Sequence, residues 1–288
     1  MRLLPTPTDD QAAVFALCIN SISNMELRNR LEAISLHFNA AAQDYFARGQ
    51  LRQLYLIPAV NLKDDAIVVG AVTKAELKSA YSDHMVGKGK PAREIYDRLI
   101  LSAPFRRCPY CGIGHTTTLD HYLPKAKFPL LSVVTLNLVP SCKDCNTDKR
   151  ISFATTETEQ TLHPYFEQNA VIDEQWLYAH LNQSNPPVLE FFVSAPAHWP
   201  NILKDRVAAH FTSYNLKARY SLEASNGLAT LRDTLDLIWE KAGEQGVREH
   251  LNATAAGHAR RHANAWDTAM YQTLAGNHWY CAGGFREL

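Results

Sequence analysis

The chain has 288 residues, of which 46% are hydrophobic and 20% charged, the composition of an ordinary folded protein rather than a disordered one. Its formal net charge is zero, so no global excess of positive charge points to a nucleic-acid partner. The N-terminus lacks the apolar stretch of a signal peptide, and no segment approaches the ~18 apolar residues that span a bilayer. We therefore expect a cytoplasmic protein with no membrane partner and with reduced cysteines.

The first hundred residues have the apolar spacing of amphipathic helices. Apolar side chains recur every three or four positions from Val14 to Ile22 and again from Leu27 to Tyr45. Thr73 and Glu76 have the spacing of a capping box at the start of a further helix. These patterns predict a helical N-terminal region over residues 1–103.

The composition changes between Cys108 and Ile151, where Gly, Pro, Cys and Thr become frequent and the β-like pieces, at 116–120 and 136–139, are short. Residues 101–150 include seven Lys and Arg residues and three Asp residues, so this segment carries a local excess of positive charge. We place it in a small module over residues 104–170.

The remaining residues, 171–288, are expected to form a hairpin followed by helices. Trp176–Leu181 and Val188–Val193 are two β-like runs separated by a short polar and proline-rich turn. Helical periodicity resumes after Trp199. The predicted fold class is α+β, a mainly helical frame around the module with a short β-hairpin after it.

Two Cys-x-x-Cys pairs mark the module as a metal site. Cys108 and Cys111 form the first pair, Cys142 and Cys145 the second, and four thiolates suit a tetrahedral, structural Zn²⁺ ion. One such pair alone is compatible with redox chemistry, but two pairs in one short segment favour zinc. About 30 residues separate the pairs, more than the 15–20 of common zinc ribbons, so a further structural element is expected between them.

Polar residues with a characteristic order lie between and just after the cysteine pairs. Asp120-His121 comes first, then Asn137, then Asn146 directly after the last cysteine. This arrangement resembles the HNH endonuclease superfamily, whose ββα-metal fold has a first strand ending in Asp-His, a loop, a second strand bearing Asn, and a helix with the last ligand. The resemblance covers about 45 residues and includes both cysteine pairs.

The resemblance implies a role for each of these residues. His121 would be the general base that deprotonates water, a task suited to a side chain with a pKa near neutrality. Asp120 and Asn146 would hold the catalytic cation, and Asn137 would fix the loop that carries the base. Many members have histidine where this chain has Asn146, and an Asp and Asn oxygen set favours Mg²⁺ or Mn²⁺.

The resemblance also implies nucleic acid as the substrate. DNA is expected first, because most of the family cuts DNA, and RNA is the alternative. Candidate phosphate contacts are the basic residues of the loop and of the predicted helix: Lys125, Lys127, Lys149 and Arg150. One HNH centre cuts one strand, so a double-strand break would need a homodimer or two events.

Three questions stay open at this stage. The helical flanks look similar to HNH proteins of bacterial antiphage defence operons, notably the nuclease partner of an ATPase in Septu-type systems, so an ATPase or sensor partner could activate a silent enzyme. A non-catalytic zinc module that binds nucleic acid or protein is the alternative from another class. His163 fits either a further phosphate or metal contact or a packing residue, and its apolar neighbours favour packing.

Overall fold

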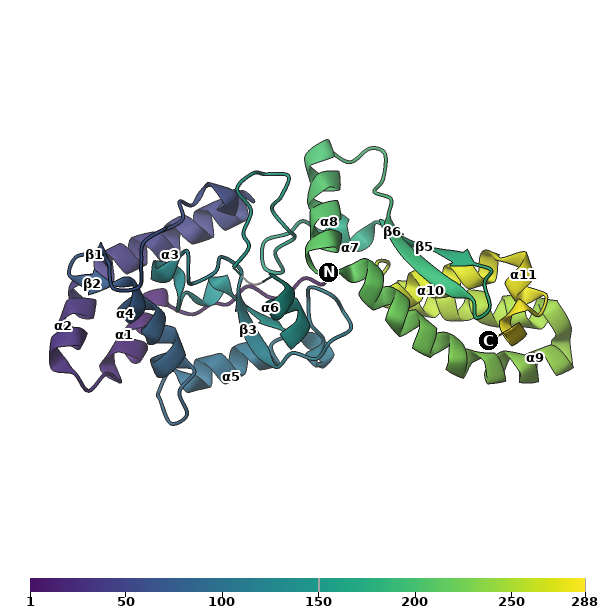
Figure 1. The fold of residues 1–288 in the computed structure, drawn as a ribbon, viewed down its shortest axis with the longest axis horizontal. Coiled ribbons are helices and arrows are strands. Elements are labelled where there is room, and N and C mark those ends of the chain that lie inside the picture. The colour runs from purple at the N-terminus through teal and green to yellow at the C-terminus, as the bar shows by residue number, and fades with distance from the viewer. Residues whose placement is uncertain (150, 288) are drawn as a thin grey trace. The chain divides into compact units, whose positions relative to one another are not determined.

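A computed structural model describes residues 1–149 and 151–287, which combine helices with three separate two-stranded antiparallel sheets (Figure 1). The predicted mixture of helices and small sheets is confirmed. The chain divides into two compact units, one over Arg2–Glu167 and one that runs from Gln168 onward and includes Met1. Residues 2–103 lie in the same compact unit as the cysteine-rich module.

The first unit begins with helices, as the apolar spacing predicts. The elements are α1 (Gln11–Asn20), α2 (Met25–Ala33), α3 (Ser35–Gln50), β1 (Ile67–Val69), β2 (Val72–Thr73), α4 (Lys74–Ser79), the π-helical segment Ala80–Met85 and α5 (Arg93–Leu101). The predicted capping box at α4 is present: the Glu76 backbone N–H donates to Thr73 Oγ1 at 3.3 Å, and the Thr73 N–H donates to Glu76 Oε2 at 2.8 Å. Two of the N-terminal donors of α4 are satisfied in this way.

A short antiparallel pair followed by a helix forms the centre of this unit. Strand β3 (Thr118–His121) pairs with β4 (Leu138–Ser141), so that Asp120 lies opposite Val139 and His121 opposite Leu138. Helix α6 (Lys143–Lys149) follows directly and packs against β3, while α5 contacts both strands. The strands begin two residues later than predicted, and nearly all of their residues are buried.

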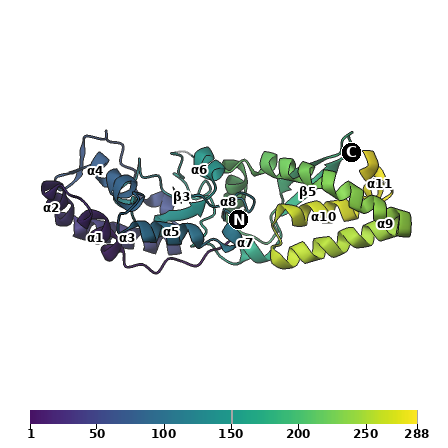
Figure 2. The same ribbon diagram turned by 90° about the horizontal axis from the view of Figure 1, so that it is seen from below.

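The second unit contains the predicted hairpin and the C-terminal helices. Its elements are α7 (Ala170–Asp173), β5 (Leu177–Asn182), β6 (Val188–Val193), α8 (Asn201–Ser213), α9 (Leu216–Arg261), α10 (Trp266–Gly276) and α11 (His278–Cys281). The β5–β6 ribbon packs on α9 and α10, and α10 runs alongside α9 (Figures 1 and 2). Helix α9 bends at Gly243, whose φ of +59° is a left-handed conformation that favours glycine. Among residues 1–149 and 151–287, no helix has the length and hydropathy needed to cross a membrane.

The capping box gives a stability prediction. Thr73→Ala removes the side-chain acceptor for the Glu76 N–H, and we expect it to lower the free energy of unfolding by about 1 kcal/mol in urea denaturation. Thr117→Ala, at an exposed position of the same unit, is the control and should change this free energy by less than about 0.5 kcal/mol. Equal losses in the two variants would refute a specific contribution of the cap.

Candidate metal centre and active site

Four cysteine side chains converge in the first unit. The Sγ atoms of Cys108, Cys111, Cys142 and Cys145 all lie within 4.8 Å of one another, and all four residues are buried. The Cys111 and Cys142 Sγ atoms are 3.8 Å apart, which matches the ~3.8 Å edge of a tetrahedron with Zn–S bonds of about 2.3 Å. The four residues therefore fit a tetrahedral Zn²⁺ ion.

The backbone around the cysteines supports metal binding. Gly112 has a φ of +73° and its N–H donates to the Cys108 carbonyl at 2.8 Å, which turns the chain so that both thiols point inward. The Gly114 N–H lies 3.4 Å from Cys111 Sγ and the Cys145 N–H lies 3.5 Å from Cys142 Sγ. Backbone donors aimed at sulfur stabilise the thiolate form that a metal requires.

The ionisation of the cluster also calls for a cation. A hydrogen bond from Cys108 lowers the pKa of Cys111 to about 7, and hydrogen bonds from the other three thiols lower the pKa of Cys142. Burial, in contrast, raises the pKa of Cys108. Four touching, buried thiols cannot all ionise unless positive charge lies among them, and a bound metal ion such as Zn²⁺ would supply that charge.

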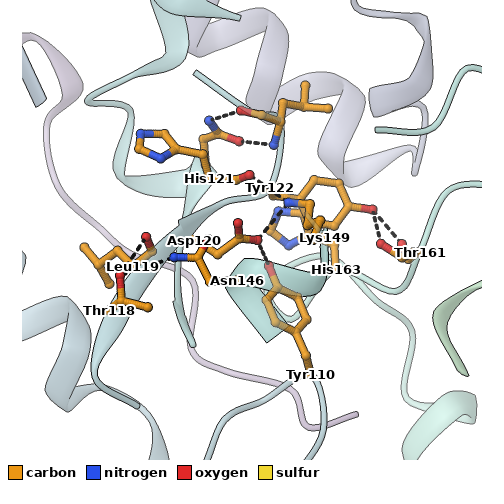
Figure 3. Close-up of polar contacts among 12 residues, drawn as sticks. Tyr110, Thr118, Leu119, Asp120, His121, Tyr122, Asn146, Lys149, Thr161 and His163 are labelled. Atoms are coloured by element: carbon orange, nitrogen blue, oxygen red, sulfur yellow. Dashed lines mark hydrogen bonds and ion pairs between the residues drawn. The ribbon is translucent and has the colours of Figure 1, made fainter. Parts of the chain in front are cut away.

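Asp120, the predicted metal ligand, is 3% exposed and already has two donors on one carboxylate oxygen (Figure 3). The Tyr110 hydroxyl donates to Oδ2 at 3.0 Å, and the Lys149 ammonium donates to the same oxygen at 2.7 Å. Lys149 also donates to the His121 carbonyl at 2.7 Å and lies 5.0 Å from the centre of the Tyr122 ring. A buried ion pair thus links α6 to β3.

The burial of Lys149 bears on its predicted role as a phosphate contact. Lys149 is 7% exposed, so it is not available as a surface contact for phosphate in this structure. Burial lowers the pKa of its ammonium group, and the neighbouring Asp120 carboxylate opposes this shift. Asn146 and Lys149 are three residues apart on α6 and therefore share the helix face that packs on β3.

His121 faces away from Asp120, as successive residues of a strand do. Its Nε2 lies 2.8 Å from the Ser132 carbonyl oxygen, which can only accept, so Nε2 carries the proton and the lone pair of the neutral ring is on Nδ1. The Tyr81 ring packs edge-on against it with centroids 4.4 Å apart. Burial lowers the pKa of His121 to about 3, so the imidazole is neutral at neutral pH.

Asn137 fastens the loop that follows His121. Its side chain is fully buried, and its Oδ1 accepts from the Leu123 N–H at 2.7 Å. Its Nδ2 donates to the Leu123 and Leu131 carbonyls at 3.0 and 3.2 Å, and its backbone carbonyl accepts from the Tyr122 N–H at 2.8 Å. These bonds hold the chain on both sides of the loop between β3 and β4.

Asn146 lies half-buried beside β3, where its Nδ2 donates to Thr118 Oγ1 at 3.3 Å. This bond orients the amide so that Oδ1 is the group able to accept a cation. Asp120 and Asn146 therefore offer the hard oxygen ligands that Mg²⁺ and Mn²⁺ prefer. In this structure Asp120 Oδ2 is already paired with Lys149.

The two loop lysines contact the N-terminal part of the unit. Lys125 Nζ donates to Ser82 Oγ at 2.6 Å and lies 4.6 Å from the centre of the Tyr81 ring, while Lys127 Nζ donates to Asn61 Oδ1 at 2.7 Å. Both lysines are half-buried. Arg150, the fourth predicted phosphate contact, lies outside the described residues.

His163 and Tyr110 complete the surroundings of the site. His163 is buried, with Nδ1 accepting from the Tyr165 N–H at 3.1 Å and Nε2 3.0 Å from Tyr45 Oη, which agrees with a packing role. The sequence motifs did not single out Tyr110, which donates to Asp120. Its position between Cys108 and Cys111 is the one available signal, because the cysteine pair holds it near β3.

Metal content tests the cysteine cluster. We expect purified wild-type protein to retain about one zinc ion per chain and Cys145→Ser to lose it, as measured by elemental analysis. Cys18→Ala is the control, because Cys18 is equally buried but lies in α1 outside the cluster, and this variant should retain zinc. Full zinc occupancy in Cys145→Ser would contradict the assignment.

Asn137 gives a second prediction. Asn137→Ala leaves one buried N–H and two buried carbonyls without this partner, so we expect a loss of roughly 2–4 kcal/mol in the free energy of unfolding. Asn61→Ala, which removes an exposed amide from the same unit, should cost less than about 1 kcal/mol. Similar denaturation midpoints for the two variants would show that Asn137 does not hold the loop.

Comparison with known proteins identifies a relative that aligns with nearly the whole chain. No family model and no solved structure matches it. Protein ea31 of Escherichia phage lambda is 33% identical over 288 residues, an alignment that covers 96% of this chain and 97% of the phage protein. An identity of this size over nearly the full length of both chains shows common descent, and the chain belongs to the family of protein ea31.

Proposed function

We propose that this protein is a metal-dependent HNH endonuclease that hydrolyses phosphodiester bonds, with DNA as the preferred substrate. One observation carries the proposal: β3, β4 and α6 follow one another as an antiparallel pair and a helix, with Asp120-His121 at the end of the first strand and Asn146 on the helix. The cysteine cluster connects the segment before β3 to the start of α6. Order, topology and metal ligands together support the HNH assignment.

Two features of His121 bear on its proposed role as the general base. The Ser132 carbonyl fixes the proton on Nε2, which leaves the lone pair of Nδ1 to accept a proton from water. A pKa of about 3 leaves this nitrogen unprotonated at neutral pH, but it also makes the imidazole a weaker base than one with a pKa near neutrality. Asn137 positions the loop that supplies the Ser132 carbonyl through its bond to Leu131.

A divalent cation held by Asp120 and Asn146 would neutralise charge on the phosphate and on the departing oxygen. Asp120 and His121 are adjacent in β3, and their side chains point to opposite sides of the strand. Lys125 and Lys127 are the described basic residues nearest in sequence to the base and are proposed to approach the phosphate backbone.

The neutral net charge bears on how such an enzyme would be controlled. Nonspecific DNA affinity is mostly electrostatic, so a chain with no excess positive charge binds DNA weakly on its own. We propose that an ATPase or sensor partner brings the enzyme to its substrate in an antiphage defence setting, and that a homodimer would cut both strands. The cytoplasm is the compartment in which such an enzyme would meet DNA.

A non-catalytic zinc module is the second candidate. The ion pair between Lys149 and Asp120 favours it, because the predicted cation ligand is already paired. The burial of His121, which is 8% exposed, also favours it. This candidate requires the four cysteines and predicts that substitution of His121 leaves nucleic-acid binding unchanged.

Cleavage of plasmid DNA tests the proposal. Zinc-loaded wild-type protein should cut with Mg²⁺ or Mn²⁺ and not with EDTA, and His121→Ala should cut at least ~100-fold more slowly because it lacks the base. His37→Ala, at an exposed position of α3, is the control and should cut at the wild-type rate.

The alternatives give different results in the same assay. Equal cutting by wild type and His121→Ala would rule out His121 as the base. DNA binding without cleavage by wild type, even at high protein and metal concentration, would favour the zinc module. Cleavage that appears only on addition of a partner ATPase would support the enzyme and its control together.

A further inference from the structure

Lys149 is a buried cation in direct contact with the predicted metal ligand. Its ammonium lies 2.7 Å from Asp120 Oδ2 and 2.7 Å from the His121 carbonyl oxygen, and its side chain is 8% exposed. A buried ammonium group is stable only when oxygens replace the water that it has lost. The protein provides two such oxygens from the strand that carries Asp120 and His121.

The arrangement leaves Asp120 Oδ2 with no capacity for a second cation at the same place. Oδ2 accepts from Lys149 and from Tyr110, whose hydroxyl is 3.0 Å away and whose side chain is fully buried. A divalent ion on this oxygen would meet the ammonium group at short range in a region with little water, where like charges repel strongly. The two cations therefore compete for Oδ2.

We propose that Lys149 is a resident counter-ion of Asp120 that competes with the divalent cation, so that the ion binds Asp120 Oδ2 only when the ammonium group is displaced. The inference rests on the proposed function, because it takes Asp120 as the ligand of that cation. Lys149 and Asn146 share one face of α6, so the residue that would bind the ion and the residue that excludes it are carried by the same helix turn. Lys149 thereby sets the affinity of the site for metal.

Lys149 also donates to the His121 carbonyl, so competition for Asp120 is coupled to the hydrogen bonding of His121. Displacement of Lys149 from Asp120 also affects its bond to the His121 carbonyl, which belongs to the residue that carries the base. Metal binding and the local hydrogen bonding of the strand end are therefore linked through one side chain. Without the metal, the ion pair stabilises the link between α6 and β3.

Mn²⁺ binding to zinc-loaded protein tests the inference independently of cleavage. The readout is the concentration of free Mn²⁺ in electron paramagnetic resonance titrations. Lys149→Met, which is unbranched and one atom shorter than lysine and removes the charge, should bind Mn²⁺ at least tenfold more tightly than wild type. Lys149→Gln, which can still donate to Asp120, should show the same direction and guards against a packing defect in the methionine variant.

The controls separate local competition from general electrostatics. Lys143→Met removes the same charge from an exposed position of α6 and should change the affinity less than threefold. Adding Asp120→Asn to Lys149→Met should abolish the gain, because the ligand is then lost. Circular dichroism and zinc content must match wild type in each variant that is compared.

Three results would overturn the inference. These are unchanged or weaker Mn²⁺ binding in both Lys149 variants, an equal gain in Lys143→Met, and a gain that survives Asp120→Asn. Failure of the proposed nuclease function is distinguishable, because it would appear as tighter Asp120-dependent Mn²⁺ binding without cleavage of DNA or RNA.

Discussion

The site depends on the four buried cysteines, because they join two segments that the small sheet alone cannot hold. Two-stranded sheets are marginal in water, and β3 and β4 are each only four residues long. The cluster connects the turn at Cys108 and Cys111 to Cys142 and Cys145 at the start of α6. Metal binding in such small elements supplies folding free energy. Tyr110, placed by the same turn, then reaches Asp120.

Close to the cysteine cluster, a few buried hydrogen bonds define the orientation of His121. Asn137 satisfies three backbone groups of the loop between β3 and β4, and the Ser132 carbonyl of that loop fixes the protonated nitrogen of His121. Each bond is made in a region with little water, where an unmatched polar group would be costly. The orientation of one imidazole is therefore set by residues up to 16 positions away in the sequence.

Much of the fold could be predicted from local patterns. The capping box at Thr73 and Glu76 and the hairpin at β5–β6 depend on neighbouring residues, and both are confirmed. The cysteine spacing predicted a cluster that the structure contains. The burial of Lys149 could not be predicted, because a lysine near a helix end is usually solvated. The packing of α6 on β3 shows that the neighbour of Lys149 is the buried carboxylate of Asp120. The HNH roles of Asp120, His121 and Asn146 stay predictions.

The π-helical segment Ala80–Met85 gives the site a dependence on the first hundred residues. The Tyr81 ring packs edge-on against the His121 ring. The Lys125 ammonium group lies over the same Tyr81 ring and donates a hydrogen bond to Ser82 Oγ. π-Helical turns are rare and are found frequently at functional sites. The segment from Cys108 to Lys149 therefore depends on residues outside it. Without Ala80–Met85, His121 would lose its contact with Tyr81, and Lys125 would lose its contacts with Tyr81 and Ser82.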